Sequence, residues 1–117
     1  MAQFALLFRG GLTTNGNASP EQIQAHFQKW MAWSGQLRES NAMTGEPLED
    51  DGKTIQGPQK SVTDGPYAEL KDLIGGFMII EAASIEEATE IAKGCPIFED
   101  HDNGSVEVRP VANLTGG

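Results

Sequence analysis

A carboxylate precedes a rigid turn directly at Asp64-Gly65-Pro66. In one interpretation Asp64 is structural and accepts hydrogen bonds from the backbone N–H groups of its own turn. In the other it acts as a general acid or base, or anchors a ligand, because a carboxyl group in a partly apolar pocket suits such chemistry. Tyr67 follows the turn and can present its hydroxyl to the same ligand. The two interpretations of Asp64 are compatible with each other.

His26 is a second side chain that can move protons, because imidazole is the natural proton shuttle near neutral pH. A helical wheel places His26 between Trp30 and Trp33, at the edge of an apolar face, where the three rings would form the rim of a small-molecule pocket. His26 and Asp64 are therefore the candidate catalytic pair, with Tyr67, Trp30 and Trp33 as candidate ligand contacts. The alternatives are a boundary histidine bonded to solvent or backbone, and tryptophans that serve the core or a dimer contact.

Arg9 ends the first predicted strand, and Arg109 lies near the end of the last one. If these strands are neighbours in the sheet, their two guanidinium groups can bind an anion together. Arg9 is therefore a further candidate ligand contact. The alternative is that both arginines pair with glutamates at the surface.

The sequence predicts no metal site and no cofactor. His101 lies in the acidic run Glu99-Asp100-His101-Asp102, but adjacent loop residues rarely converge on one ion, and no other His or Cys pair has zinc-like spacing. The chain also lacks a P-loop, a dinucleotide fingerprint and a Gly-x-Ser-x-Gly motif. Cys95 follows a predicted helix C-terminus, where the helix dipole disfavours a thiolate, so a buried thiol is expected.

Length and charge limit the class of protein. With 117 residues we expect a single domain, residues 1–117, with one core. A net charge of -9, with eight scattered basic residues, argues against nucleic acid and an anionic membrane surface as partners. No stretch reaches the roughly 18 apolar residues of a membrane span, and no signal-peptide pattern is seen, so a cytoplasmic location is expected.

Apolar periodicity and capping signals predict the elements of the first half. A strand is expected over residues 3–9. A helix follows, because Ser19 can cap it and Gln22 completes a capping box. Gly35 is expected to end this helix, and residues 36–43 are expected to be extended.

The second half is predicted to contain more strands than helices. Residues 44–63 are expected to form hairpins, with a tight turn at Asp51-Gly52. The strand over 76–82 is apolar on both faces, which predicts a central position in the sheet. The remaining expected elements are a helix over 84–93, with a second capping box at Ser84 and Glu87, a loop over 98–104 and a last strand over 105–109.

This order of elements predicts the α+β class, with a ferredoxin-like split βαβ arrangement, an inserted hairpin, and both helices on one face of an antiparallel sheet. Phe4, Leu6 and Phe8 cannot face the helices together with Ala5 and Leu7, so the second face of the sheet also needs cover. A second copy of the sheet is the simplest cover. We therefore expect a homodimer in which two sheets face each other around a shared interior.

The order of elements and several motifs resemble the YCII-related family, and specifically its DGPF branch. Residues Asp64-Gly65-Pro66-Tyr67-Ala68-Glu69 are similar to the Asp-Gly-Pro-Phe-Ala-Glu segment of that branch, with Tyr67 in place of Phe. The resemblance continues through Gly75-Gly76-Phe77, Cys95-Pro96 and residues 104–110, and it covers nearly the whole chain. It implies a dimeric ferredoxin-like α+β barrel.

The resemblance implies less about function. YCII-like proteins have been suggested to be enzymes that act through a His-Asp pair, the His on the first helix and the Asp in the turn, which correspond here to His26 and Asp64. The expected function is therefore the binding of a small polar molecule near the Asp64 turn, with acid/base chemistry by that pair. The alternative is a non-enzymatic dimeric interaction or regulatory module, for example one linked to sigma-factor regulation, because some DGPF members are associated with such factors.

Overall fold

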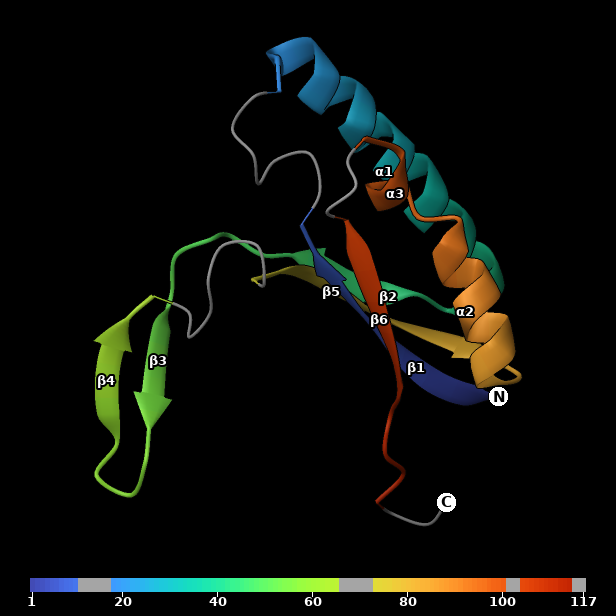
Figure 1. Ribbon diagram of the computed structural model, residues 1–117. Helices are drawn as coiled ribbons and strands as arrows, with labels where there is room; N and C mark the ends of the chain where they lie inside the picture. Colours follow the sequence, from blue (N-terminus) through green and yellow to red (C-terminus); the bar gives the residue numbers. More distant parts are fainter. Residues whose placement is uncertain (11–17, 66–72, 101–103, 115–117) are drawn as a thin grey trace.

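A computed structural model shows a sheet with helices on one side and a two-stranded hairpin set apart from it (Figure 1). The structure describes residues 1–10, 18–65, 73–100 and 104–114. Its elements, in chain order, are β1 (Ala2–Arg9), α1 (Pro20–Asn41), β2 (Thr44–Pro47), β3 (Lys53–Gln56), β4 (Ser61–Asp64), β5 (Ile74–Ala82), α2 (Ile85–Lys93), α3 (Ile97–Asp100) and β6 (Ser105–Pro110).

Four strands form an antiparallel sheet in the order β2-β5-β1-β6, and β3 pairs with β4 in a separate two-stranded sheet. Helix α1 connects β1 to β2, and these two strands lie on either side of β5, which is the arrangement of a split βαβ unit. The central position predicted for β5 is confirmed. The architecture is therefore a mixed α+β fold with an antiparallel sheet.

Alternation along β1 and β5 gives the sheet two different faces. On the helix-covered face, Phe4 lies opposite Ile80 and Leu6 lies opposite Met78, and all four side chains are buried together with Phe8. Further buried residues come from the helices and connections around this face: Leu37, Met43, Ala88, Ala92, Cys95 and Ile97. The core of the molecule is thus confined to one side of the sheet.

The opposite side of the sheet is also apolar at its centre. Ala5 lies opposite Ile79, and Leu7 lies opposite Phe77. Phe77 is 37% exposed, while Ala5, Leu7 and Ile79 are half-buried. The three described helices all lie on the other side (Figure 1). We refer to these four residues as the open face.

Helix α1 begins as predicted and ends later than predicted. Ser19 caps it, and both bonds of the capping box with Gln22 are present, at 3.1 and 2.8 Å. The expected end at Gly35, and the extended segment after it, are wrong, because the helix continues to Asn41. Glycine inside a helix costs only about 1 kcal/mol relative to alanine. The burial of Leu37 beyond it is worth more than that.

Helix α1 carries two apolar stripes, and only one of them packs on the sheet. Trp30 and Trp33 are half-buried against the core. By contrast, Ile23, Phe27 and Met31 are 42%, 60% and 50% exposed, although their spacing of four residues places them in one row. We refer to these three residues as the α1 stripe.

The second helical region also differs in part from prediction. Ser84 caps α2 as expected, with its hydroxyl accepting from the Glu87 backbone N–H at 3.1 Å. The second bond of the expected capping box differs, because the Glu87 side chain accepts from the Ala83 N–H at 3.4 Å. A short helix, α3, occupies residues that were expected to be a loop. Pro96 precedes it directly, and its carbonyl accepts from the Glu99 N–H at 3.0 Å, which closes the first turn. Among the described helices, none is both long and apolar enough to cross a membrane.

The β3–β4 hairpin is closed by a different turn from the one predicted. The Lys60 N–H donates to the Gly57 carbonyl at 3.0 Å, so the chain reverses over Gly57–Lys60. The tight turn expected at Asp51-Gly52 is wrong because β2 pairs with β5 instead of with β3. This choice leaves β3 and β4 to pair with each other, away from the main sheet (Figure 1).

Gly45 is required by the close approach of β2 to β5. A Cβ at this position would lie 2.7 Å from the Cα of Met78 and closer still to the backbone oxygen of Phe77. Both atoms belong to the backbone of the central strand and cannot move aside. Gly45→Ala is therefore expected to lower the free energy of unfolding by roughly 1–3 kcal/mol in urea denaturation. Gly52→Ala is the control, since no atom lies within 4 Å of its Cβ position, and equal stabilities of the two variants would contradict this account.

Candidate functional site

Most candidate residues lie at one end of the sheet. The register places Pro47, Gly76, Phe8 and Val106 in one row across the four strands, and Arg9 follows directly after Phe8. From this end β1 leads toward α1, β2 leads toward the hairpin, and the chain returns from the hairpin to β5 (Figure 1). Arg9 and the strand ends that connect to α1 and to the hairpin therefore share one end of the sheet.

An aromatic cluster lies over this end of the sheet. Phe8 contacts Trp30 and Trp33 edge to face, with ring centroids 5.0 and 6.2 Å apart, and the two indoles are 5.7 Å apart at 83°. Edge-to-face pairs of this kind add about 0.5–1.5 kcal/mol each beyond the area that they bury. The two tryptophans therefore serve the packing of α1 on the sheet, whatever else they contact.

His26 is held by this cluster. The Trp30 indole N–H donates to His26 Nε2 at 2.7 Å, and the two rings are 6.2 Å apart. Because Nε2 is the acceptor, the neutral imidazole carries its proton on Nδ1. The half-buried ring is thus fixed in one orientation by a core residue four positions along the same helix.

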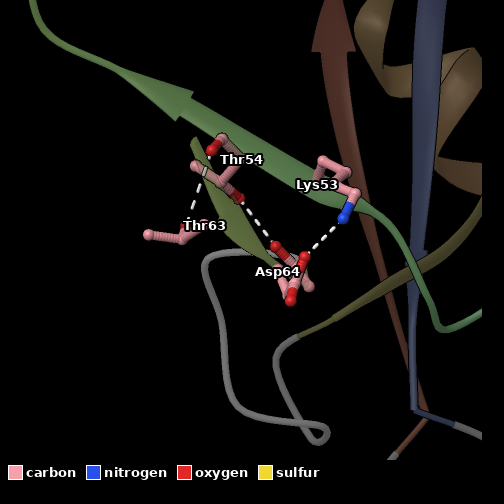
Figure 2. Close-up of polar contacts among 5 residues, drawn as sticks. Lys53, Thr54, Thr63 and Asp64 are labelled. Carbon is pink, nitrogen blue, oxygen red and sulfur yellow. Dashed lines mark hydrogen bonds and ion pairs between the residues drawn. The ribbon is translucent and has the colours of Figure 1, made fainter. Parts of the chain in front are cut away.

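Asp64 lies at the base of the hairpin, where β4 ends (Figure 2). Its carboxylate pairs with Lys53 Nζ, and the two side chains are 90% and 67% exposed. Gly65 adopts a left-handed φ of +86°, its N–H donates to the Gly52 carbonyl at 2.6 Å, and its carbonyl accepts from Thr54 Oγ1 at 2.9 Å. The turn is therefore held by its backbone, and the Asp64 carboxylate remains exposed to solvent.

The structure holds the candidate catalytic residues on separate elements. His26 lies on α1, and Asp64 lies on the hairpin, which extends away from α1 (Figure 1). Their described contacts are with Trp30 and Lys53 respectively. His26, Trp30 and Trp33 are brought together; the pairing of His26 with Asp64 stays a prediction. Tyr67 lies outside the described residues.

Arg9 pairs with a glutamate of the neighbouring strand. Its Nη1 lies 2.7 Å from Oε1 of Glu107, whose other oxygen lies 3.9 Å from Nε of Arg109. The two arginines therefore share one carboxylate on the β1–β6 side of the sheet, which is the surface pairing considered as the alternative to an anion site. Within the described part of the chain, no cluster of three His, Cys, Asp or Glu side chains could hold a metal ion.

Two residues of this region were not found from the sequence. Lys53, the partner of Asp64, becomes predictable once the turn is placed at Gly57–Lys60, because an antiparallel ladder closed there sets residue 53 opposite residue 64. The signal was the Gly57-Pro58 break. Glu107 could have been found from the alternation of β6, which places it on the same face as Arg109.

Comparison with known proteins assigns a family. The model of the YCII-related domain matches residues 11–115. An uncharacterised protein of Rhizobium meliloti (strain 1021) is 43% identical over 51 residues, which are 44% of this chain and only 40% of that protein's length. A solved structure, the 5-chloro-2-hydroxyhydroquinone dehydrochlorinase TftG of Burkholderia phenoliruptrix AC1100 in complex with 2,5-dihydroxybenzoquinone, has a TM-score of 0.47 and 18% identity, covering 95% of this chain and 94% of that one.

Cys95 is a buried thiol, as expected. Burial raises its pKa from 9.0 to about 12, against the lowering effect of the Ile97 backbone N–H, and Glu99 adds to the rise. The folded chain thus holds this proton more tightly than the unfolded chain does. The resulting stability is complete below pH 9.0 and is lost as the pH rises toward about 12.

Replacing Cys95 should therefore change how stability depends on pH. For Cys95→Ala we expect a shallower decline in the free energy of unfolding above pH 9.0 than for the wild type, measured by urea denaturation at a series of pH values. The lost packing lowers stability equally at every pH and serves as the internal reference. An equally steep decline in both proteins would contradict the assignment.

Proposed function

The chain belongs to the YCII-related family, and we propose that it is a dimeric member of the DGPF branch that binds a small polar organic molecule beside the Asp64 turn. The observation that carries this proposal is the exposed Lys53–Asp64 pair at the base of the hairpin. It offers an ammonium and a carboxylate side by side, with the backbone of the turn already fixed by its own hydrogen bonds.

Assignment to the DGPF branch is supported by the backbone at Gly65. Its φ of +86° is a left-handed conformation that side chains rarely adopt, so the glycine of the Asp-Gly-Pro motif has a physical requirement in this chain. The motif would thus be retained for the shape of the turn, which presents the preceding carboxylate outward.

The dimer is supported by the open face. Its apolar residues Ala5, Leu7, Phe77 and Ile79 lie across two adjacent central strands. Two such faces packed together stand about 10 Å apart and bury each other's side chains. Because the two copies would use the same surface, a twofold dimer built as an α+β barrel follows.

The chemistry of the exposed pair favours a polar ligand. An exposed ion pair contributes only about 0–1 kcal/mol to stability, so a ligand can replace the Lys53–Asp64 contact at little cost. A molecule with both an anionic or carbonyl oxygen and a hydrogen-bond donor would satisfy the two side chains at once. In the enzymatic version, His26 and Asp64 form an acid/base pair that moves a proton of the bound molecule.

Ligand binding is tested by thermal shift with a panel of small carboxylic acids, amino acids, phenols and hydroxyquinones. We expect at least one compound to raise the melting temperature of the wild type, because a ligand that binds only the folded state stabilises it. Asp64→Asn should abolish the shift. Glu90→Gln is the matched control, since Glu90 also forms an exposed ion pair, with Lys93 at 2.8 Å. Shifts that persist in Asp64→Asn would overturn the proposed site.

The same compounds test for acid/base chemistry. If the pair moves protons, a bound compound with an acidic C–H should exchange it for deuterium in D₂O, and the exchange should stop in both Asp64→Asn and His26→Gln. Binding without exchange would indicate a binding protein instead of an enzyme.

A non-enzymatic interaction module is the second candidate, and the α1 stripe favours it. Ile23, Phe27 and Met31 form an exposed apolar row of the kind that contacts a partner such as a regulatory protein. Phe27→Ser should therefore leave the free energy of unfolding within about 0.5 kcal/mol of the wild type, whereas Trp30→Ser should cost several times more. Similar losses in both variants, measured by urea denaturation, would show that the stripe serves the fold.

A further inference from the structure

The β3–β4 hairpin is an arm that packs little of its surface on its own chain. Its cross-strand pair Ile55 and Val62 is 66% and 60% exposed. The radius of gyration is 15.8 Å, against roughly 13 Å for a compact domain of this length, in agreement with a projecting arm (Figure 1). An isolated two-stranded hairpin is marginally stable in water at best. Its apolar pair therefore needs a surface to cover it.

An arm on the second copy would enlarge the interface between two sheets. Four strands about 4.8 Å apart, with about six residues each, present a footprint of roughly 400 Å². A stable interface buries about 800 Å² of accessible surface on each partner, a quantity that is larger than the flat footprint of the same contact. One face of a short hairpin adds roughly 150 Å². This gain is made twice in a twofold dimer, because each copy both gives an arm and receives one.

The charges of the arm and of the sheet are complementary. The arm, residues 53–64, carries Lys53, Lys60 and Asp64 and is net positive, in a chain whose net charge is -9. Glu46 lies opposite Phe77 at one border of the open face, and Glu81 follows two residues after Ile79 on the same side of β5. At the opposite border, Glu107 and Arg109 lie across from Leu7 and Ala5 and pair with each other, so the acidic part of this face is its β2–β5 border. A cationic arm laid along that border would meet carboxylates, while two whole copies otherwise repel each other.

We propose that the arm crosses to a second copy of the chain and lays Ile55 and Val62 along the β2–β5 border of the open face of that copy, beside the packed sheet, so that the Asp64 site is shared between the two copies. This inference rests on the proposed dimer and ligand site and not on the acid/base pair, because α1, which carries His26, lies on the other side of the sheet from the open face. In one chain the Asp64 carboxylate is 90% exposed. Water there weakens every polar contact with a ligand. Enclosure by the second copy removes that water, so the site is incomplete in a monomer.

Disulfide trapping tests where the arm lies. A Val62→Cys protein is mixed with a Phe77→Cys protein, allowed to exchange subunits and oxidised mildly. We expect a covalent dimer of twice the 12.6 kDa chain mass on a non-reducing gel. Ser61→Cys replaces Val62→Cys in the control, because adjacent residues of a strand point to opposite faces. A link that forms equally well with Ser61→Cys, or no link with Val62→Cys, would overturn the placement.

A charge on the arm tests whether the site needs both copies. Val62→Asp should weaken the dimer at least tenfold in sedimentation, and Ser61→Asp should not. At a concentration at which Val62→Asp is monomeric, this variant should also lose the Asp64-dependent thermal shift, and circular dichroism should show that it is folded. If this monomer keeps the shift, the shared site is wrong and the ligand site stands. If the wild type is itself monomeric, the dimer and the shared site are both wrong. If it is dimeric but insensitive to Val62→Asp, only the arm is wrong.

Discussion

Strands β1 and β5 pair along nearly their whole lengths, from Ala2 opposite Ala82 to Phe8 opposite Gly76. The side chains of this ladder decide where the other elements can lie. One face holds large aromatic and aliphatic groups, with Phe4 and Phe8 among them, and the helices cover it. The other face is also apolar at its centre, where it carries Ala5, Leu7, Phe77 and Ile79. A slip of one residue would exchange the two faces and place the large rings where no helix packs, so the register is strongly specified.

The inserted hairpin carries Asp64 away from this ladder. β2 pairs with β5 through only four residues, and the chain then leaves the sheet, although the Leu48 N–H still donates to the Gly75 carbonyl at 2.9 Å. The core is complete without β3 and β4, which contribute no residue to it. Their side chains are therefore free to serve recognition, as loops on a rigid scaffold commonly do.

The sequence predicted what depends on local signals, and it failed where distant contacts decide. The Ser19 and Ser84 caps are set by residues within three positions, and both are confirmed. The end of α1 at Gly35 was wrong because the packing of Leu37 outweighs the local helix cost of glycine. The hairpin turn was misplaced because the pairing of β2 with β5 is a long-range choice. For the same reason the sequence named Asp64 but not its partner.

The stability of the arm and the solvation of Asp64 both depend on how far Ile55 and Val62 are exposed to water, and they are 66% and 60% exposed. The Lys53–Asp64 pair is exposed and contributes at most about 1 kcal/mol, so it cannot hold the hairpin by itself. Covering Ile55 and Val62 would contribute roughly 1.5–3 kcal/mol for each side chain if fully buried. Whatever covers that apolar pair thus dominates the energetics of the arm. It also determines how much water reaches the carboxylate two residues after Val62, and hence whether Asp64 remains a solvated surface charge or becomes a group that binds and reacts.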